Sequence, residues 1–362
     1  QLHAQLEVIR NLVEANTARP AKALRVLVPE IRHDELTLHD CIGHGQDADV
    51  RRGEYAGQRV AIKVLRGRLS DQEIKRLRKE GSVLHQLHHV NIVQLLGISV
   101  DDRNKCCIVM ELAEESLADL LERRQDEPFE LAEILAMLRD MLRGLAHMHR
   151  LKVYHRDLKS LNVLVFPGGV LKLADLGAAK ADALATQQSA GGQRGTYPWM
   201  APEVMQLSED EDLNGNGWAK VDIFALMIIL WQLLTRQVPW EGLNILRISQ
   251  KVTGGQRPEL PPATPSATTP PTLEQQTEAA LRRLLEDNWG QDPGSRAAAS
   301  EILRDVDRML GELGGDPRPR RQDDRAAERA AEAAAAVERA VEADRRARVD
   351  EVEALKAQLQ AA

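Results

Sequence analysis

The pattern of apolar and polar residues predicts short strands in the first third of the chain and helices in the remainder. Residues 60–63 alternate as a strand does, and the runs at 36–38, 92–96 and 106–110 are rich in Val, Ile and Leu and of strand length. Residues 131–149 carry the apolar spacing of a long amphipathic helix. The chain therefore combines a small sheet with a mainly helical part, which is the α+β class.

Three further sequence features predict helices outside residues 131–149. Residues 223–234 form the longest apolar run, but Gln232 interrupts it, and it is too short to span a bilayer. We therefore interpret it as a buried core helix and expect no membrane span. Ser116 is a suitable N-cap for the helix that follows it. Residues 2–13 place apolar side chains at helical spacing, which predicts a short helix packed on the neighbouring domain.

The last part of the chain has a different composition. From Pro317 onward it is dominated by Ala, Glu, Arg and Asp, which favours a long helix with ion pairs along its faces. A coiled coil would need a regular apolar seam, and Arg345 and Arg348 fall where apolar residues should be. A solvated helix or frayed tail is the favoured interpretation, and self-association or binding of a partner helix through residues 318–362 is the alternative.

Composition and charge narrow the possible partners. The chain has 362 residues, 43% hydrophobic and 28% charged, which suits a globular protein of two lobes. Its net charge of −7 argues against nucleic acid or an anionic membrane as the main partner. The three cysteines form no disulfide framework, so we expect a cytoplasmic, intracellular location. The chain begins at Gln1, which suggests a piece of a longer protein.

The candidate chemistry lies in a compact polar loop at residues 155–162 and in an acid that follows it, Asp175. Few reactions need one acid that can accept a proton, an amide, and a second acid that can hold a metal ion. In phosphoryl transfer the protein mainly positions a hydroxyl and neutralises phosphate charge with Mg²⁺. Asp157 fits the hydroxyl-orienting role, and Lys159 can contact the transferring phosphate. The residues that fit the metal role are Asn162 and Asp175.

This stretch resembles the catalytic and metal-binding loops of eukaryotic protein kinases, and further kinase motifs occur in order along the chain. The resemblance implies a two-lobed protein kinase fold over residues 36–310. A five-stranded antiparallel sheet with one main helix would occupy 36–110, a hinge 111–113, and a larger, mainly helical lobe 114–310. Residues 1–35 would form an N-terminal helical extension and 311–362 a helical tail.

The resemblance also implies the cofactors ATP and Mg²⁺, bound in the cleft of that fold. Lys63 would grip the α- and β-phosphates and would be held by Glu80, while Asn162 and Asp175 would bind Mg²⁺. Two departures from the kinase pattern predict a lowered nucleotide affinity: Asp47 at the tip of the glycine-rich loop and Ala48 in place of its third glycine. The residues implied to contact the nucleotide are Ile42, Gly43, Gly45, Val50, Ala61, Lys63, Met110, Glu111, Ala113 and Leu164.

Residues 195–203 are similar to the tyrosine kinase-like group, which includes the mixed-lineage and Raf-type kinases. Together with Lys159, they imply a protein substrate with a serine or threonine acceptor. Residues 178–194 resemble an activation segment, and Arg156 is placed to receive a phosphate there. The phosphorylation candidates are Thr186, Ser189 and Thr196.

Two long-range contacts and two other functions complete the expectations. The resemblance implies a buried ion pair of Glu203 with Arg296, and a carboxylate at Asp222 that reaches the backbone of the catalytic loop. A pseudokinase that acts as a binding module is one alternative, supported by Asp47 and Ala48. A tyrosine or dual-specificity kinase is the other, and the residues around Thr196 and Lys159 disfavour it.

Overall fold

The computed structural model describes residues 28–45, 48–85, 87–175, 180–181, 197–208, 212–213, 217–262 and 270–318. The chain divides into two compact units, one comprising residues 1–86 and 95–111 and the other residues 87–94 and 112–362. The first is dominated by a sheet and the second by helices, which confirms the α+β class. The helix predicted at residues 2–13 and the tail from residue 319 lie outside the described residues.

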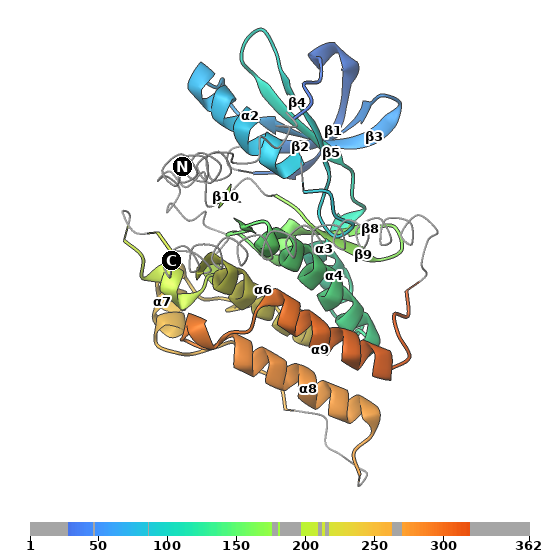
Figure 1. Cartoon of the computed structure of the whole chain (residues 1–362), viewed down its shortest axis with the longest axis vertical. Coiled ribbons are helices and arrows are strands. Elements are labelled where there is room, and N and C mark those ends of the chain that lie inside the picture. The colour runs from blue at the N-terminus through green and yellow to red at the C-terminus, as the bar shows by residue number, and fades with distance from the viewer. Residues whose placement is uncertain are drawn as a thin grey trace, which may run out of the picture. The chain divides into compact units, whose positions relative to one another are not determined.

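The first unit is built on an antiparallel sheet of five strands in the order β1, β2, β3, β5, β4 (Figure 1). On one face of this sheet, Val60 and Ile62 pack with Ile31, Cys107 and Val109 in a buried apolar cluster. The five-stranded antiparallel sheet implied by the kinase resemblance is therefore confirmed. The strands are β1 (Leu36–His44), β2 (Ala48–Tyr55), β3 (Gln58–Leu65), β4 (Leu95–Val100) and β5 (Cys106–Glu111), and a short 3-10 helix, η1 (His33–Glu35), precedes them.

The main helix of this unit, α2 (Asp71–His85), covers the opposite face of the sheet. Leu77 and Leu84 of the helix pack against the apolar cluster that contains Ile98, as does Ile108 of β5. The approach is close, because a Cβ atom at Gly81 would lie 2.7 Å from Cδ1 of Ile98. The helix is thereby fixed against β4 and β5, and β5 is the neighbour of β3, the strand that carries the predicted phosphate-binding lysine.

The prediction of a strand over residues 92–96 is wrong at its start, because β4 begins only at Leu95. The backbone N–H of Val93 donates instead to the carbonyl of Leu173, at 2.8 Å, and the N–H of Leu173 donates to the carbonyl of Asn91, at 2.9 Å. Both partners belong to the second unit. The apolar run is continuous in sequence, but these bonds hold its first residues in the second unit. Its remaining residues, from Leu95, form β4 in the first unit.

The segment before β1 is part of the first unit as well. The N–H of Ile31 donates to the carbonyl of Ile98 at 2.8 Å, and the N–H of Ile98 donates to that of Pro29 at 2.9 Å. A Cβ atom at Gly97 would lie 2.7 Å from the Pro29 carbonyl oxygen. Glycine is therefore required at this position, because the two backbones approach more closely than a side chain allows.

The second unit is mainly helical, and α4 and α9 lie side by side within it (Figure 1). The hydroxyl of Ser116 accepts from the N–H of Asp119, and the Asp119 carboxylate accepts from the N–H of Ser116, so the predicted N-cap is confirmed. The helices are α3 (Leu117–Arg123), α4 (Leu131–Arg150), α5 (Pro202–Met205), α6 (Gly217–Thr235), α7 (Ile245–Thr253), α8 (Leu273–Asn288) and α9 (Ala299–Glu312). Short strands β6 (Glu115–Ser116), β7 (Val153–Tyr154), β8 (Val163–Phe166), β9 (Val170–Leu173) and β10 (Lys180–Ala181), with 3-10 turns η2 (Ser160–Asn162), η5 (Tyr197–Trp199) and η6 (Pro293–Ser295), complete the unit.

The predicted buried helix at residues 223–234 is confirmed as part of α6. Among the described residues, α6 is the one helix long and apolar enough to cross a membrane, but most of it is enclosed within the fold. Every residue from Val221 to Leu233 is buried. Its apolar character is therefore accounted for by its place in the core of the second unit.

A pair of neighbouring, mutually tilted histidine rings makes the stability of this unit dependent on pH. The rings of His89 and His147 lie 4.9 Å apart, and Nδ1 of His89 accepts from the N–H of Asn91 at 3.0 Å. Burial, together with the positive charges of His147, Arg143 and Arg150, lowers the pKa of His89 from 6.5 to about 3. The folded protein therefore keeps this ring neutral over a range in which the unfolded chain protonates it.

We expect the free energy of unfolding to fall as the pH is lowered from about 6.5 towards 3, by on the order of 1 kcal/mol per pH unit from this group. The sign follows because the unfolded state binds the extra proton. Urea unfolding of wild type and of the His89→Asn variant, which keeps a hydrogen-bond acceptor, measures the difference in slope. The free energy of unfolding of His89→Asn should depend less steeply on pH than that of wild type. His88→Asn, a change at an exposed neighbour, should keep the wild-type slope. Equal slopes for wild type and His89→Asn would contradict the assignment.

Candidate active site

The catalytic loop lies between β7 and β8 and brings three predicted residues together on one carboxylate. Oδ2 of Asp157 accepts from Nζ of Lys159 at 2.8 Å and from Nδ2 of Asn162 at 3.0 Å. Asn162 also donates to the backbone carbonyl of Asp157 at 2.8 Å. Lys159 and Asn162 are buried. Because an ammonium and an amide hold it, the carboxylate has a fixed direction, as a group that orients a hydroxyl requires.

Asp175, the second predicted metal ligand, follows β9 directly. The N–H of Ala174 donates to the carbonyl of Asn162 at 2.8 Å, which fixes the chain just before Asp175 next to the catalytic loop. Asp175 is exposed and has a φ of 53°, a left-handed conformation that residues other than glycine seldom adopt. Such strained residues cluster at functional sites.

A buried acid on α6 supports the backbone of the catalytic loop. Asp222 accepts from the N–H groups of His155 and Arg156, both at 2.9 Å, and lies 2.8 Å from Nε2 of His149. Arg156 has a φ of 65°, so the carboxylate stabilises a conformation that is unfavourable by itself. The expectation that Asp222 reaches the backbone of this loop is confirmed.

The ion pair expected between Glu203 and Arg296 is also present in the second unit. The guanidinium of Arg296 makes two contacts with the Glu203 carboxylate, at 2.6 and 2.9 Å, and donates to the carbonyls of Lys220 and Gly290. Arg296 is 1% exposed. The pair ties the start of α5 to the segment before α9, and it is fully desolvated on the arginine side.

In the first unit, strand register places the predicted nucleotide contacts on one face of the sheet. Gly43 pairs with Val50, Val50 with Lys63, and Lys63 with Ile108, and paired residues point to the same side of a sheet. Ala61 lies two residues from Lys63 on β3 and therefore shares this face, as does its partner Met110.

Helix α2 covers the same face, because Ile108 and the helix residues Leu77 and Leu84 pack against one cluster. Glu80 lies between Leu77 and Leu84 on the helix at spacings of three and four residues, so it belongs to the side of the helix that packs on the sheet. Lys63 and Glu80 are thus both directed into the layer between sheet and helix. Their ion pair stays a prediction.

Gly45 in the glycine-rich loop lies close to the backbone of the strand that follows the loop. The N–H of Gly45 donates to the carbonyl of Ala48 at 2.8 Å, and a Cβ atom at Gly45 would lie 2.9 Å from that oxygen. A side chain at this position would therefore displace the turn. Ile42 is exposed, and the loop tip, with Asp47, lies outside the described residues.

The remaining predicted nucleotide contacts are divided between the two units. Glu111 ends β5 in the first unit, whereas Ala113 and Leu164 belong to the second. Leu164 lies on β8, opposite Ser116 of β6. Their contacts with adenine stay predictions.

Comparison with known proteins decides the family. The family model described as protein kinase domain matches residues 36–306, which is most of the chain. The chain belongs to the protein kinase domain family. The fold described above is accordingly that of a kinase domain, and domains of this family are transferases that use ATP. The domain contains the carboxylate of Asp157 and the supporting acids Asp222 and Glu203.

Individual relatives agree on the family and differ in the acceptor that their names state. The kinase domain is 29% identical over 291 residues to serine/threonine-protein kinase STY17 of Arabidopsis thaliana, covering 80% of this chain and 47% of that protein. It is 33% identical over 306 residues to probable serine/threonine-protein kinase drkD of Dictyostelium discoideum, covering 81% and 21%. It is 31% identical over 277 residues to tyrosine-protein kinase csk-1 of Caenorhabditis elegans, covering 76% and 47%. The chain spans less than half the length of these relatives.

The residues of the kinase domain suit Mg²⁺, which the family generally uses with ATP. Both hydrogen bonds of the Asn162 side chain use Nδ2, so the other arm of the amide carries the oxygen that a hard cation prefers. Asp175 supplies an exposed carboxylate, and its direct neighbour Ala174 is hydrogen-bonded to the backbone of Asn162. Amide and carboxylate oxygens are the ligands Mg²⁺ takes from proteins, with phosphate oxygens completing the shell.

Sequence reasoning missed the present partner of Arg156. Its guanidinium lies 4.4 Å from the ring centroid of Trp218, whose Nε1 donates to Asp212 at 2.7 Å. This cation-π contact forms because Asp222 holds the backbone of Arg156 against α6, whose first turn contains Trp218. No sequence pattern indicates this proximity. The predicted phosphorylation sites Thr186, Ser189 and Thr196 lie outside the described residues.

Replacing Asp222 by asparagine should destabilise the kinase domain by about 1.5 to 3 kcal/mol, the range for hydrogen bonds to a charged group. An amide can accept on one oxygen only, and its NH₂ group would face a backbone N–H of His155 or Arg156. Urea unfolding followed by tryptophan fluorescence measures the change. The kinase activity should fall in parallel, since the loop that carries Asp157 loses its support. An Asp222→Asn variant as stable and as active as wild type would contradict this role.

Proposed function

We propose that the kinase domain transfers the γ-phosphoryl group of ATP to serine or threonine hydroxyls of other proteins and that it belongs to the tyrosine kinase-like group. The observation that carries this proposal is the contact of Lys159 and Asn162 with one oxygen of Asp157, at 2.8 and 3.0 Å. A carboxylate in this setting accepts a proton, and an ammonium beside it stabilises a transferring phosphate.

In the proposed reaction, the hydroxyl oxygen of the substrate attacks the γ-phosphorus of ATP, and the bond from that phosphorus to the β-phosphate oxygen breaks. ADP leaves, and the hydroxyl proton passes to the Asp157 carboxylate. Asn162 and Asp175 would hold Mg²⁺, which would neutralise the phosphate charge. Lys63, oriented by Glu80, binds the α- and β-phosphates of the same nucleotide.

The choice of serine or threonine rests on sequence features. Lys159 is the residue that serine/threonine kinases carry in the catalytic loop, and residues 195–203 resemble the tyrosine kinase-like group. Two of the relatives named above are called serine/threonine kinases and one a tyrosine kinase. A signalling role in the cytoplasm, on protein substrates, is part of this proposal.

The test is phosphorylation of three peptide pools whose only acceptor is serine, threonine or tyrosine, with Mg²⁺ and labelled ATP. The serine and threonine pools should be labelled and the tyrosine pool should not. Predominant labelling of tyrosine would overturn the proposed acceptor, although not the kinase reaction itself.

A second candidate is a pseudokinase that binds partners through the kinase fold. Its support is Ala48, which stands where the family has a glycine and is buried in the structure, and the acid at position 47. The two functions differ in one measurement, made on protein phosphorylated beforehand by a cell extract. Mg²⁺-ATP binding with no transfer to any pool would favour the binding module.

A further inference from the structure

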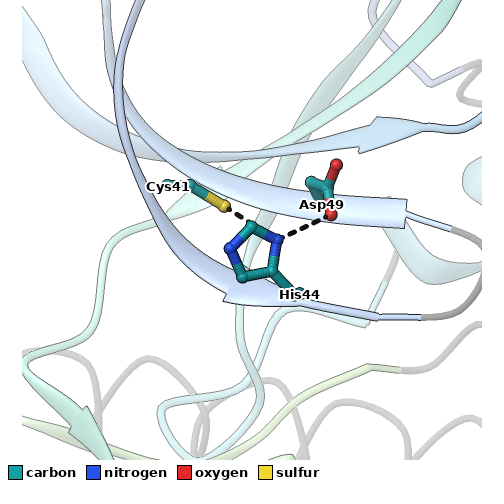
Figure 2. A group of neighbouring side chains, drawn as sticks. All are labelled: Cys41, His44 and Asp49. Atoms are coloured by element: carbon teal, nitrogen blue, oxygen red, sulfur yellow. Dashed lines mark hydrogen bonds and ion pairs between the residues drawn. The ribbon is translucent and has the colours of Figure 1, made fainter.

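A cysteine, a histidine and an aspartate meet where β1 and β2 enter the glycine-rich loop (Figure 2). The imidazole of His44 lies between the other two side chains. Its Nδ1 is 3.6 Å from Sγ of Cys41 and 3.1 Å from Oδ1 of Asp49. We propose that Cys41, His44 and Asp49 form a binding site for a zinc-type divalent cation, with water in the fourth position.

An irregularity in β1 makes this site possible. In a regular strand, residues three apart, such as Cys41 and His44, point to opposite faces. Here Cys41 pairs with Arg51, and Gly43 with the next residue of β2, so Ile42 is an extra residue in the ladder. This bulge restores Cys41 and His44 to one face. Asp49 is the pairing partner of His44 and therefore shares that face.

The site lies on the opposite face of the sheet from the predicted phosphate-binding lysine. Val50, between Asp49 and Arg51 on β2, is the partner of Lys63, and neighbouring residues of a strand point to opposite faces. The cluster therefore does not share a face of the sheet with Lys63, and none of its residues is among the proposed Mg²⁺ ligands, Asn162 and Asp175. Its ligand chemistry is also different, because thiolate and imidazole suit zinc and are poor ligands for Mg²⁺.

The spacing of the three groups fits a tetrahedral ion. With Zn–S near 2.3 Å and Zn–N near 2.0 Å, sulfur and nitrogen on one tetrahedron are separated by about 3.5 Å, and nitrogen and oxygen by about 3.4 Å. The corresponding distances here are 3.6 and 3.1 Å, and all three ligand atoms lie within 4.8 Å of one another. Small side-chain rotations therefore complete the geometry.

The present contacts show what the ion would replace. The single S–H of Cys41 has two acceptors within reach, the carbonyls of Gly43 at 3.3 Å and Val50 at 3.4 Å, and Arg66 donates to Oδ1 of Asp49 at 2.7 Å. A Zn²⁺ ion would take the place of the thiol proton and compete with the guanidinium. Thiolate and carboxylate together balance its charge. Because the ligands come from both strands, the bound ion would join β1 to β2 at the base of the glycine-rich loop.

The experiment titrates the full chain, reduced and free of metal, with Co²⁺ as a spectroscopic probe for zinc. Wild type should bind one Co²⁺ with a thiolate-to-metal charge-transfer band and the visible absorption of a tetrahedral site, and added Zn²⁺ should displace it. Cys41→Ser should abolish the charge-transfer band. His44→Ala and Asp49→Asn should each weaken Co²⁺ binding at least tenfold, and Arg66→Met should strengthen it several-fold.

The matched control is His39→Ala, a change at another exposed histidine of β1, which should bind Co²⁺ as wild type does. Thermal unfolding without metal checks that each variant folds. A second measurement needs no variant: Zn²⁺, but not Mg²⁺, should slow alkylation of Cys41 by iodoacetamide, with the modified residue identified by mass spectrometry. Absence of the thiolate band in wild type, its persistence in Cys41→Ser, or alkylation of Cys41 unaffected by Zn²⁺ would overturn the proposal.

Discussion

Replacement of Asp157 by asparagine should lower the rate of phosphoryl transfer by about 10²- to 10⁴-fold, the usual contribution of a group that takes up a proton in the transition state. The amide can still accept a hydrogen bond from Lys159, whose Nζ lies 2.8 Å from Oδ2 in wild type. It cannot accept the proton of the substrate hydroxyl. The measurement is the turnover rate with saturating Mg²⁺-ATP and the serine and threonine peptide pools.

Two controls make the result specific. The variant should bind Mg²⁺-ATP within a few-fold of wild type, since Asp157 is assigned to the hydroxyl and not to the nucleotide. Asp126→Asn makes the same chemical change at an exposed turn of the second unit and should leave the rate unaltered. An Asp157→Asn variant that keeps more than a tenth of the wild-type rate would contradict the role given to this carboxylate.

Removing the buried guanidinium at position 296 should have the largest effect on stability. In Arg296→Met, the Glu203 carboxylate loses both of its contacts, at 2.6 and 2.9 Å, and two backbone carbonyls lose a donor. Breaking a buried ion pair from one side costs about 3 to 5 kcal/mol, because the remaining charge is left without compensation. All five tryptophans lie in the second unit, so their fluorescence during urea unfolding follows this unit specifically.

The matched control is Arg308→Met on α9. The contact of Arg308 with Asp305 is 3.3 Å long, and both side chains are 61% exposed. Exposed pairs contribute at most about 1 kcal/mol, so this variant should unfold almost as wild type does. If Arg296→Met and Arg308→Met lost the same small amount of stability, the ion pair of Glu203 would not have the importance assigned to it.

The catalytic loop was predictable from sequence because its contacts are local. Asp157, Lys159 and Asn162 lie within six residues of one another, so one motif contains all three groups that meet in the structure. The long-range partners of Asp222 and Arg296 could be predicted only through the resemblance to kinases. Nothing in their own flanking residues indicates a contact with positions 66 or 93 residues away.

Other features depend on tertiary contacts that leave no sequence signal. Composition predicts that Arg318 starts a solvated tail, yet Arg318 donates to Asp140 at 2.8 Å and to the carbonyl of Gly169 at 2.7 Å. Burial tends to raise the pKa of the neighbouring Asp316, but the hydrogen bond and charge of Arg318 outweigh it and hold that pKa at about 2. The cluster at Cys41 likewise depends on the bulge at Ile42, which pairing with β2 creates.

The proposed function requires Lys63 and Asp175 each to contribute to the binding of magnesium-bound ATP. The most direct test is the dissociation constant of ATP, measured calorimetrically with and without Mg²⁺, for wild type, Lys63→Met in the first unit and Asp175→Asn in the second. We predict that each variant weakens Mg²⁺-ATP binding at least about tenfold, the loss of roughly one charge-assisted contact. In Asp175→Asn, Mg²⁺ should no longer improve the affinity for ATP. A correctly folded Lys63→Met or Asp175→Asn variant that binds Mg²⁺-ATP as tightly as wild type would contradict the account.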